Sequence, residues 1–493
     1  MQFTRKWLGA ALLIFAFVAT LLAAAMPKTS PATAGVDNGY YGKKAKYVFY
    51  FIGDGMAMAQ INAAEIFKGT MTGSNPMNRV PVNFATFPFQ GMQTTHSANT
   101  FITESAAAGT ALATGHKTNN DVLGMDAGKT VKFKTMAELA KEKGLKVGIV
   151  TSVSLDHATP GAFYAHEPTR KNYYEIGLAM ADSGFDYFAG GGLLAPAGPG
   201  KDKPNVLDIA RQKGYKVVNS REAIAGLGKA DGRVIAINPV LANEEALEYE
   251  IDRTDQLSLA DFTRKGIELL DNPAGFFLMV EGGKVDWAAH ANDAATTIRD
   301  VLAFEAAIGE ALRFYASHPD ETLIVVTGDH ETGGMSIGFA GTEYQTFFAK
   351  LGRQALSFEE FDKQIKAYRQ STAAADASLA DWLPVLVERF GLDGLTDYER
   401  DRLQSALAAT MVDPKKRNKD PYSYLLYGTY EPFSVTVTHL LNQRAGIGWT
   451  TYAHTGVAVP VFAQGTGGSL FQGYYDNTDI AKKIMNVMGV QPQ

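Results

Sequence analysis

The sequence predicts an α/β fold, built on a large, mostly parallel central sheet with helices on both of its faces. Short apolar segments rich in β-branched and aromatic residues alternate with longer segments of helical periodicity. Polar side chains follow several of these segments directly, as at the strand ends of such folds. The predicted strands are 46–52, 146–151, 187–189, 234–237, 276–280, 323–327 and 459–463.

Helices are predicted between these strands. The pattern Thr135-x-x-Glu138 is a capping box that opens one of them. Longer helical patterns cover about 255–270 and 288–315. From about 342 to 445 the sequence is mostly helical and contains no strong buried-strand segment. We interpret this stretch as a helical insertion near the functional edge of the sheet.

Composition limits the chemistry. The chain has 493 residues, of which 46% are hydrophobic and 20% charged, enough for a large buried core. It contains no cysteine, which excludes disulfides, thiolate zinc sites, thiol nucleophiles and iron–sulfur clusters. A transition-metal site must therefore use His, Asp and Glu. The net charge of −6 argues against a nucleic-acid-binding surface, which needs excess basic charge.

Residues 1–34 are predicted to be a signal peptide. Arg5 and Lys6 precede an apolar segment at 7–25, and small residues follow it. The alternative is an uncleaved membrane anchor, because about 19 apolar residues approach the minimum for a span. With cleavage, the mature chain is 35–493. We expect an exported protein, periplasmic or extracellular, without stable membrane insertion unless the signal remains uncleaved.

Acidic residues and a histidine gather at predicted strand ends. Asp54 follows the first strand, Glu281 follows 276–280, and Asp329 and His330 follow 323–327. One such residue would mean little, because any strand ends in a polar turn. In open α/β sheets ligands bind outside the carboxyl ends of the strands. Three separate strand ends with such residues therefore indicate one shared site.

Three further residues have metal-ligand chemistry. Asp286 and His290 are four apart, so on a helix both could reach one metal ion. The alternative is an ordinary surface ion pair. His454 lies in a Gly/Thr-rich loop before a predicted strand, and its sequence context alone does not decide its role.

Ser105 and Arg170 are the candidate residues for phosphate chemistry. Ser105 precedes a segment of small helix formers, and a helix N-terminus offers free N–H groups to an anion. The alternative is that Thr103 or Ser105 is only an N-cap. Arg170 could bind a phosphate through two parallel N–H groups, although a surface salt bridge would explain an isolated arginine as well.

Taken together, these motifs resemble the alkaline phosphatases, which are secreted, metal-dependent phosphomonoesterases. They occur in the order of that family and span most of the mature chain. They are I-G-D-G at Asp54, T-E-S-A-A at Ser105, H-A-T-P at Thr159 with Arg170, V-E-G at Glu281 with Asp286 and His290, T-G-D-H at Asp329 and His330, and H-T-G at His454.

The resemblance implies roles for these residues. Ser105 would be the nucleophile that becomes phosphorylated, and Arg170 would bind the phosphate oxygens. Two zinc ions and one magnesium ion would be bound. The implied ligands are Asp286, His290 and His454 for one zinc, Asp54, Asp329 and His330 for the other, and Asp54, Thr159 and Glu281 for magnesium.

The chemistry of these side chains agrees with the implied roles. Zinc accepts imidazole nitrogen and carboxylate oxygen, and three protein ligands leave one position open. Oxygen donors suit magnesium. Two adjacent metal ions can stabilise both the attacking and the leaving oxygen. We expect Ser105 to attack a phosphate monoester, releasing the alcohol, and water to hydrolyse the phosphoserine to inorganic phosphate with net retention at phosphorus.

The sequence departs from the family pattern at three positions. Glu104 precedes the serine where many members have Asp, and the longer side chain could change how it positions Arg170. His157 stands where members have either Asp or His. Trp287 follows the predicted ligand Asp286, where many members have Lys or His. His157 and Trp287 leave the identity of the third metal and the pH optimum open.

Other functions remain as alternatives. A phosphodiesterase or nucleotide pyrophosphatase would share the two-zinc core, but Arg170 would compete with the second ester group, which favours monoesters. A sulfatase would need a cysteine or a Ser-x-Pro-x-Arg pattern, and neither occurs. A non-catalytic phosphate- or metal-binding protein is the alternative from another class. The natural substrate and the oligomeric state stay open, although many relatives are homodimers.

Overall fold

The computed structural model describes residues 42–73, 77–417 and 420–491. The predicted signal peptide lies outside the described residues. Tyr41–Gln493 forms one compact unit. Within the described part of the chain, no helix has both the length and the apolar character that crossing a bilayer requires.

A ten-stranded sheet forms the centre of this unit, in the order β14-β2-β13-β8-β1-β7-β3-β4-β6-β5. Only β13 runs antiparallel to its neighbours, so the prediction of a mostly parallel sheet is confirmed. Its strands are β1 (Tyr47–Gly53), β2 (Phe89–Thr94), β3 (Lys146–Thr151), β4 (Tyr187–Gly190), β5 (Tyr215–Val218), β6 (Arg233–Ile237), β7 (Phe276–Gly282), β8 (Thr322–Gly328), β13 (Val459–Gly465) and β14 (Gly473–Asp476).

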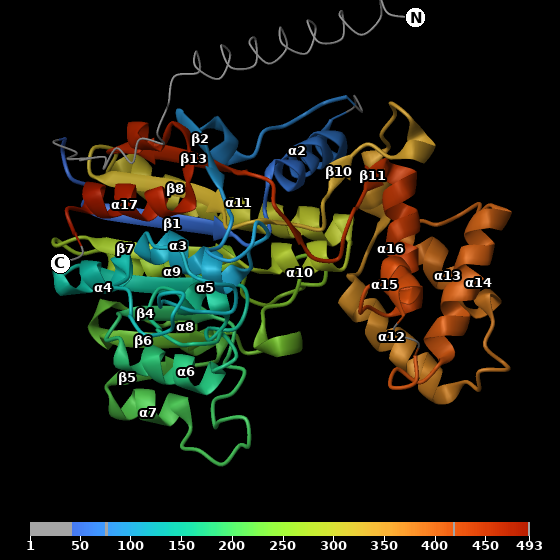
Figure 1. Ribbon diagram of the computed structural model, residues 1–493, viewed down its shortest axis with the longest axis horizontal. Coiled ribbons are helices and arrows are strands. Elements are labelled where there is room, and N and C mark those ends of the chain that lie inside the picture. Colours follow the sequence, from blue (N-terminus) through green and yellow to red (C-terminus); the bar gives the residue numbers. More distant parts are fainter. Residues whose placement is uncertain (1–41, 74–76, 418–419, 492–493) are drawn as a thin grey trace, which may run out of the picture. The chain divides into compact units, whose positions relative to one another are not determined.

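Helices cover both faces of the sheet, as predicted. One set comprises α11 with α2 and α9, both of which contact it, and the other comprises α3, α4, α5 and α17 (Figure 1). These helices are α2 (Met58–Thr72), α3 (Ser105–Thr114), α4 (Met136–Glu142), α5 (Ala158–Gly161), α9 (Leu259–Leu270), α11 (Ala294–Ser317) and α17 (Asn477–Met488). The others outside the insertion are α6 (Tyr173–Asp182), α7 (Val206–Gln212), α8 (Arg221–Ala225) and α10 (Lys284–His290).

Alternating side chains of β1 fill the two layers of core. Phe51 packs edge-on against Phe304 of α11, on one face. Tyr50 packs against Phe163, which belongs to the segment following α5, on the other face. Because both faces are covered, every residue of β1 is buried. A strand buried on both sides reads as a continuous apolar segment, which explains why the sequence located β1 well.

The register of the central strands brings the polar strand ends together. Gly53 of β1 pairs with Gly282 of β7 on one side and with Gly328 of β8 on the other. Asp54 and Asp329 therefore leave neighbouring strands at the same level. Glu281 is the second-to-last residue of β7. It therefore lies within the strand and not after it, where the sequence analysis placed it.

The prediction of a single helix over 288–315 is wrong. The chain forms α10 and α11 instead, with a break between them. Asn292 in the break has φ of +51°, a left-handed conformation that ends a helix. Asp293 then caps α11 by accepting a hydrogen bond from the Thr296 N–H at 3.1 Å. The break allows α10 to turn its Asp286 and His290 toward the strand ends.

The stretch after the sheet's β8 is mainly helical. The short strands β10 (Ser336–Ile337) and β11 (Ile447–Gly448) pair antiparallel and bring its two ends together. Its helices form one group, in which the other helices contact α16 (Figure 1). They are α12 (Phe358–Ser371), α13 (Leu379–Phe390), α14 (Asp397–Met411), α15 (Pro421–Tyr427) and α16 (Pro432–Ala445). The remaining elements are β9 (Glu331–Thr332), β12 (His454–Thr455) and the 3₁₀ helices η1 (Asn83–Thr86), η2 (Lys229–Asp231), η3 (Asn243–Glu245), η4 (Ala340–Thr342), η5 (Phe348–Arg353) and η6 (Gly468–Phe471).

Asp293 ties this helical stretch to the helices of the core. Its buried carboxylate accepts hydrogen bonds from Gln354 Nε2 at 2.9 Å and from the Phe358 N–H at 3.0 Å, in addition to those that cap α11. One side chain therefore fixes both the start of α11 and the start of α12.

We predict that Asp293→Ala lowers the free energy of unfolding by about 2–4 kcal/mol, because it leaves several buried donors without acceptors. Urea denaturation measures the change. The matched control Asp397→Ala removes an exposed aspartate at the start of α14 and should change stability by about 0.5 kcal/mol or less. Equal stability of the two variants would contradict this role of Asp293.

Candidate active site

Metal-ligand side chains from separate parts of the sequence converge beyond the ends of β1, β7 and β8. They form three groups in which the ligand atoms lie within 4.8 Å of one another. The groups are Asp286 with His290 and His454, Asp54 with Asp329 and His330, and Asp54 with His157 and Glu281. All of the predicted zinc-ligand residues thus lie in the first two groups.

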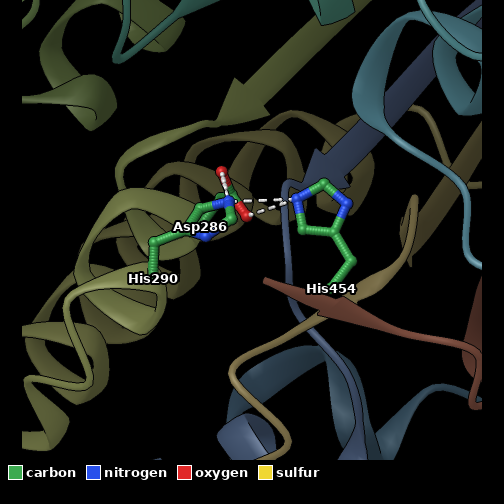
Figure 2. A group of neighbouring side chains, drawn as sticks. All are labelled: Asp286, His290 and His454. Atoms are coloured by element: carbon green, nitrogen blue, oxygen red, sulfur yellow. Dashed lines mark hydrogen bonds and ion pairs between the residues drawn. The ribbon is translucent and has the colours of Figure 1, made fainter. Parts of the chain in front are cut away.

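The first group combines α10 with the short strand β12 (Figure 2). Asp286 Oδ2 lies 3.4 Å from His290 Nε2, and Asp286 Oδ1 lies 3.6 Å from His454 Nε2. Each histidine has its Nδ1 beside a backbone carbonyl, that of Tyr452 at 2.6 Å and that of Thr103 at 2.8 Å. Each Nδ1 therefore donates to its carbonyl, and the two Nε2 atoms face each other at 3.0 Å. Beside the carboxylate of Asp286, both Nε2 atoms are positioned to bind one cation in place of a proton.

The second group is completely buried. His330 Nε2 lies 3.3 Å from Asp54 Oδ1 and 3.4 Å from Asp329 Oδ2. The other oxygen of Asp329 accepts a hydrogen bond from the Gly55 N–H at 3.1 Å, which fixes the carboxylate in place. The rings of His330 and His454 are stacked with centroids 3.7 Å apart, so the first and second groups are neighbours.

The third group contains a residue to which the sequence analysis gave no ligand role. His157 joins Asp54 and Glu281. Thr159, a predicted magnesium ligand, lies beside them and its hydroxyl donates to Asp54 Oδ2 at 3.3 Å. Thr151 at the end of β3 donates to Glu281 Oε2 at 2.5 Å. The ring of Trp287 lies 5.8 Å from that of His157, edge to face.

Burial shifts the pKa values of these groups away from their usual ranges. It raises the pKa of Asp54 and Asp329 well above normal, and the neighbouring carboxylates add to the increase. Burial also raises the pKa of Glu281 to about 7. It lowers the pKa of His157 to about 3, with the help of the positive charge of Arg170. Without further positive charge, the carboxylates would therefore tend to bind protons and the imidazole of His157 would be neutral.

These groups fit metal ions. One oxygen each of Asp54, Asp329 and Glu281 is buried with no hydrogen-bond partner among the described residues. Burying an unpaired carboxylate oxygen is costly unless a cation compensates for its lost hydration. Imidazole and carboxylate ligands suit zinc in the first two groups. The third group has more oxygen ligands, which suit magnesium, while His157 uses its Nε2 to accept a hydrogen bond from Arg170.

Ser105 is the first residue of α3, and Glu104 is its N-cap. The Glu104 carboxylate accepts hydrogen bonds from the N–H groups of Ala106 and Ala107. The alternative that Thr103 or Ser105 serves only as the N-cap is therefore wrong. Ser105 Oγ lies 3.3 Å from His330 Nε2 in the second group. The serine hydroxyl thus lies at the positive end of a helix and beside a candidate metal ligand.

Arg170 is held on two sides. Its Nη1 donates to Glu104 Oε2 at 2.6 Å, and its Nη2 donates to His157 Nε2 at 2.9 Å. The Glu104 side chain thus reaches Arg170 despite its extra methylene. Burial alone would raise the pKa of Glu104, but the guanidinium of Arg170 and three backbone N–H groups hold it below its usual value. Glu104 is therefore ionised at neutral pH and fixes both the arginine and the start of α3.

Thr332 is a site residue that the sequence analysis missed. Its hydroxyl donates to Asp286 Oδ1 at 2.5 Å and so orients that ligand. It lies two residues after His330, just beyond the T-G-D-H motif, and this spacing is the signal that could have found it.

Comparison with known proteins decides the family. The family model described as alkaline phosphatase matches residues 45–490. The chain belongs to the alkaline phosphatase family. It is 33% identical to alkaline phosphatase 4 of Bacillus subtilis (strain 168), over 90% of this chain and 88% of the relative. It is 31% identical to alkaline phosphatase 3 of the same organism, over 99% and 98%.

Solved structures of alkaline phosphatases have the same fold. The cold-active enzyme of Shewanella sp. is 31% identical, with a TM-score of 0.74 over 91% of this chain and all of that one. The enzyme of Thermus thermophilus is 26% identical, with a TM-score of 0.78 over 95% and 96%. The protein is therefore a metal-dependent hydrolase of phosphate monoesters, and the predicted enzyme class is confirmed.

We predict that Glu104→Gln raises the inhibition constant of inorganic phosphate about tenfold, because Arg170 loses its charged partner and with it the orientation of its free N–H groups. Competition against a chromogenic monoester measures the constant. Glu175→Gln, which removes the charge of a half-exposed salt bridge with Lys203, is the control and should leave the constant unchanged. Equal constants for both variants and the native enzyme would refute the positioning role of Glu104.

Proposed function

We propose that the enzyme hydrolyses phosphate monoesters through a phosphoserine at Ser105, with two zinc ions and one magnesium ion bound. One observation supports the proposal most strongly. Ser105 Oγ lies beside His330 of the second group, while the first group lies next to it through the stacked rings of His330 and His454. A phosphoryl group could therefore be attacked from the side of the second group and lose its alcohol on the side of the first.

The ligand assignment follows the three groups of side chains. We infer zinc at Asp286, His290 and His454 and at Asp54, Asp329 and His330. We infer magnesium at Asp54 and Glu281, with Thr159 and His157 beside them. Structures of variants of the TAB5 alkaline phosphatase, in which a histidine is replaced by Glu or Asp, have magnesium bound in their M3 site. Bound ions would lower the pKa of the serine hydroxyl and offset negative charge on the attacking and leaving oxygens.

The side chains of this chain supply attack and orientation. Ser105 Oγ forms the new bond to phosphorus as the ester oxygen leaves, which gives phosphoserine and the free alcohol. The guanidinium of Arg170 holds the phosphoryl oxygens. The positive end of the α3 helix dipole favours their negative charge. Water then attacks phosphoserine from the side the alcohol left, so two inversions give net retention. The serine recovers its proton and inorganic phosphate departs.

Monoesters are favoured over diesters by the rigidity of Arg170. Glu104 and His157 fix its guanidinium beside Ser105, and a second ester group on phosphorus would replace an anionic oxygen that Arg170 could bind. We further infer export, from the predicted signal peptide. Inorganic phosphate and phosphate monoesters are the expected ligands, and homodimer formation is left to measurement.

Ser105→Ala is expected to lower kcat for a chromogenic monoester at least about 10³-fold, because no hydroxyl remains to form the covalent intermediate. Its zinc and magnesium content should equal that of the native enzyme. Steady-state kinetics and metal analysis by mass spectrometry provide the two readouts. Acid quenching of the native enzyme during turnover should yield a peptide phosphorylated at Ser105.

The control is Ser469→Ala, which removes an exposed hydroxyl on η6 and should retain native turnover. Native turnover by Ser105→Ala would contradict the nucleophile assignment. Faster hydrolysis of bis(4-nitrophenyl) phosphate than of 4-nitrophenyl phosphate by the native enzyme would contradict the preference for monoesters.

A further inference from the structure

A cavity of about 280 Å³ lies beside the first group of metal-ligand side chains. One wall consists of Trp287 and His290 of α10. The lining also includes Phe358, which begins α12, Tyr430, just before α16, and Tyr249. The cavity therefore lies between the core of the enzyme and its helical insertion.

The position of the cavity relative to the nucleophile places it on the side of the leaving alcohol. Ser105 Oγ lies beside His330 of the second group, so attack comes from there. An in-line displacement expels the ester oxygen on the opposite side, toward the first group. His290 belongs to the first group and also lines the cavity. The alcohol portion of a bound monoester would therefore point at the cavity opening.

The lining is mainly aromatic. The ring of Phe358 lies 5.7 Å from the ring of Tyr430 and 5.7 Å from that of Tyr249. Trp287, Phe358 and Tyr430 are each only partly buried, so parts of their surfaces remain open to a ligand. Edge and face contacts with such rings favour a planar, apolar group over a small aliphatic one.

Charges around the cavity disfavour an anionic alcohol. Glu244 lies exposed at the lining, and the buried Glu359 lies beside it. Lys284, a cation beside the lining residues Tyr249 and Glu359, is itself buried, and its Nζ lies 3.6 Å from the centre of the Tyr249 ring and 3.5 Å from Glu359 Oε2. The charge of Lys284 is therefore compensated by Glu359 within the cavity wall and is not available to a ligand.

We propose that this cavity is a subsite for an uncharged aromatic group in the alcohol half of the substrate. The proposal rests on the proposed function, since it takes Ser105 as the nucleophile. It names aryl and arylmethyl phosphates as the preferred monoesters and Phe358 and Tyr430 as specificity-determining residues. The insertion thereby acts on substrate choice without contacting the phosphoryl group.

The test compares benzyl phosphate with ethyl phosphate, because their alcohols are similarly acidic and differ mainly in the ring. For the native holoenzyme, kcat/KM for benzyl phosphate should exceed that for ethyl phosphate by about tenfold, and 4-carboxybenzyl phosphate should lose most of this advantage. In Tyr430→Ala and in the milder Phe358→Leu the benzyl-to-ethyl ratio should fall about three- to tenfold, with kcat/KM for ethyl phosphate and inhibition by inorganic phosphate unchanged.

Binding provides a readout independent of turnover. Calorimetry on the holoenzyme should give a lower Kd for benzylphosphonate than for ethylphosphonate, neither of which has an ester bond to hydrolyse. Tyr430→Ala should remove most of this difference. The control Tyr398→Ala removes an exposed tyrosine on α14, outside the cavity, and should preserve both ratios.

Two outcomes would overturn the subsite: a benzyl-to-ethyl ratio that does not change in either variant, or an equal loss of activity toward both esters. Failure of the proposed function would look different, because the native holoenzyme would then hydrolyse neither benzyl nor ethyl phosphate.

Discussion

Three buried carboxylates without enough positive charge are the constraint on which this molecule depends. Asp54, Glu281 and Asp329 are buried together at the strand ends, and Arg170 is the arginine near them. One oxygen atom of each of these carboxylates has no hydrogen-bond partner among the described residues. Burial of such a cluster costs free energy unless cations or protons neutralise it. Metal ions at these positions would therefore serve stability as well as chemistry.

The rest of the fold holds these groups in place. The shared register of β1, β7 and β8 sets Asp54 and Asp329 side by side, and the break between α10 and α11 directs Asp286 and His290 at the same region. Glu104 couples the start of α3 to Arg170. The insertion adds a wall of aromatic side chains beside the first group. In the proposed function, attack, phosphate binding and recognition of the alcohol would thus come from separate elements around one sheet edge.

The sequence was most informative where local pattern and burial agree. Strands buried on both faces, such as β3, were found because their apolar segments are continuous. The candidate ligand residues were proposed from their places at strand ends and from the family motifs. The strands β2, β5 and β14 were missed because they are partly exposed, and β2 and β14 also contain glycine. His157 and the cavity between Trp287 and Tyr430 depend on contacts between distant segments, which composition and spacing do not reveal.

Metal titration of the chelated protein tests the central claim most directly. Zinc and magnesium are added while bound metal per chain and the thermal unfolding midpoint are measured. The account predicts two zinc ions and one magnesium ion per chain and a higher midpoint, since an ion at about 1,000 times its Kd stabilises the folded state by about 4 kcal/mol. A chelated protein with the same midpoint that binds no stoichiometric metal would contradict it.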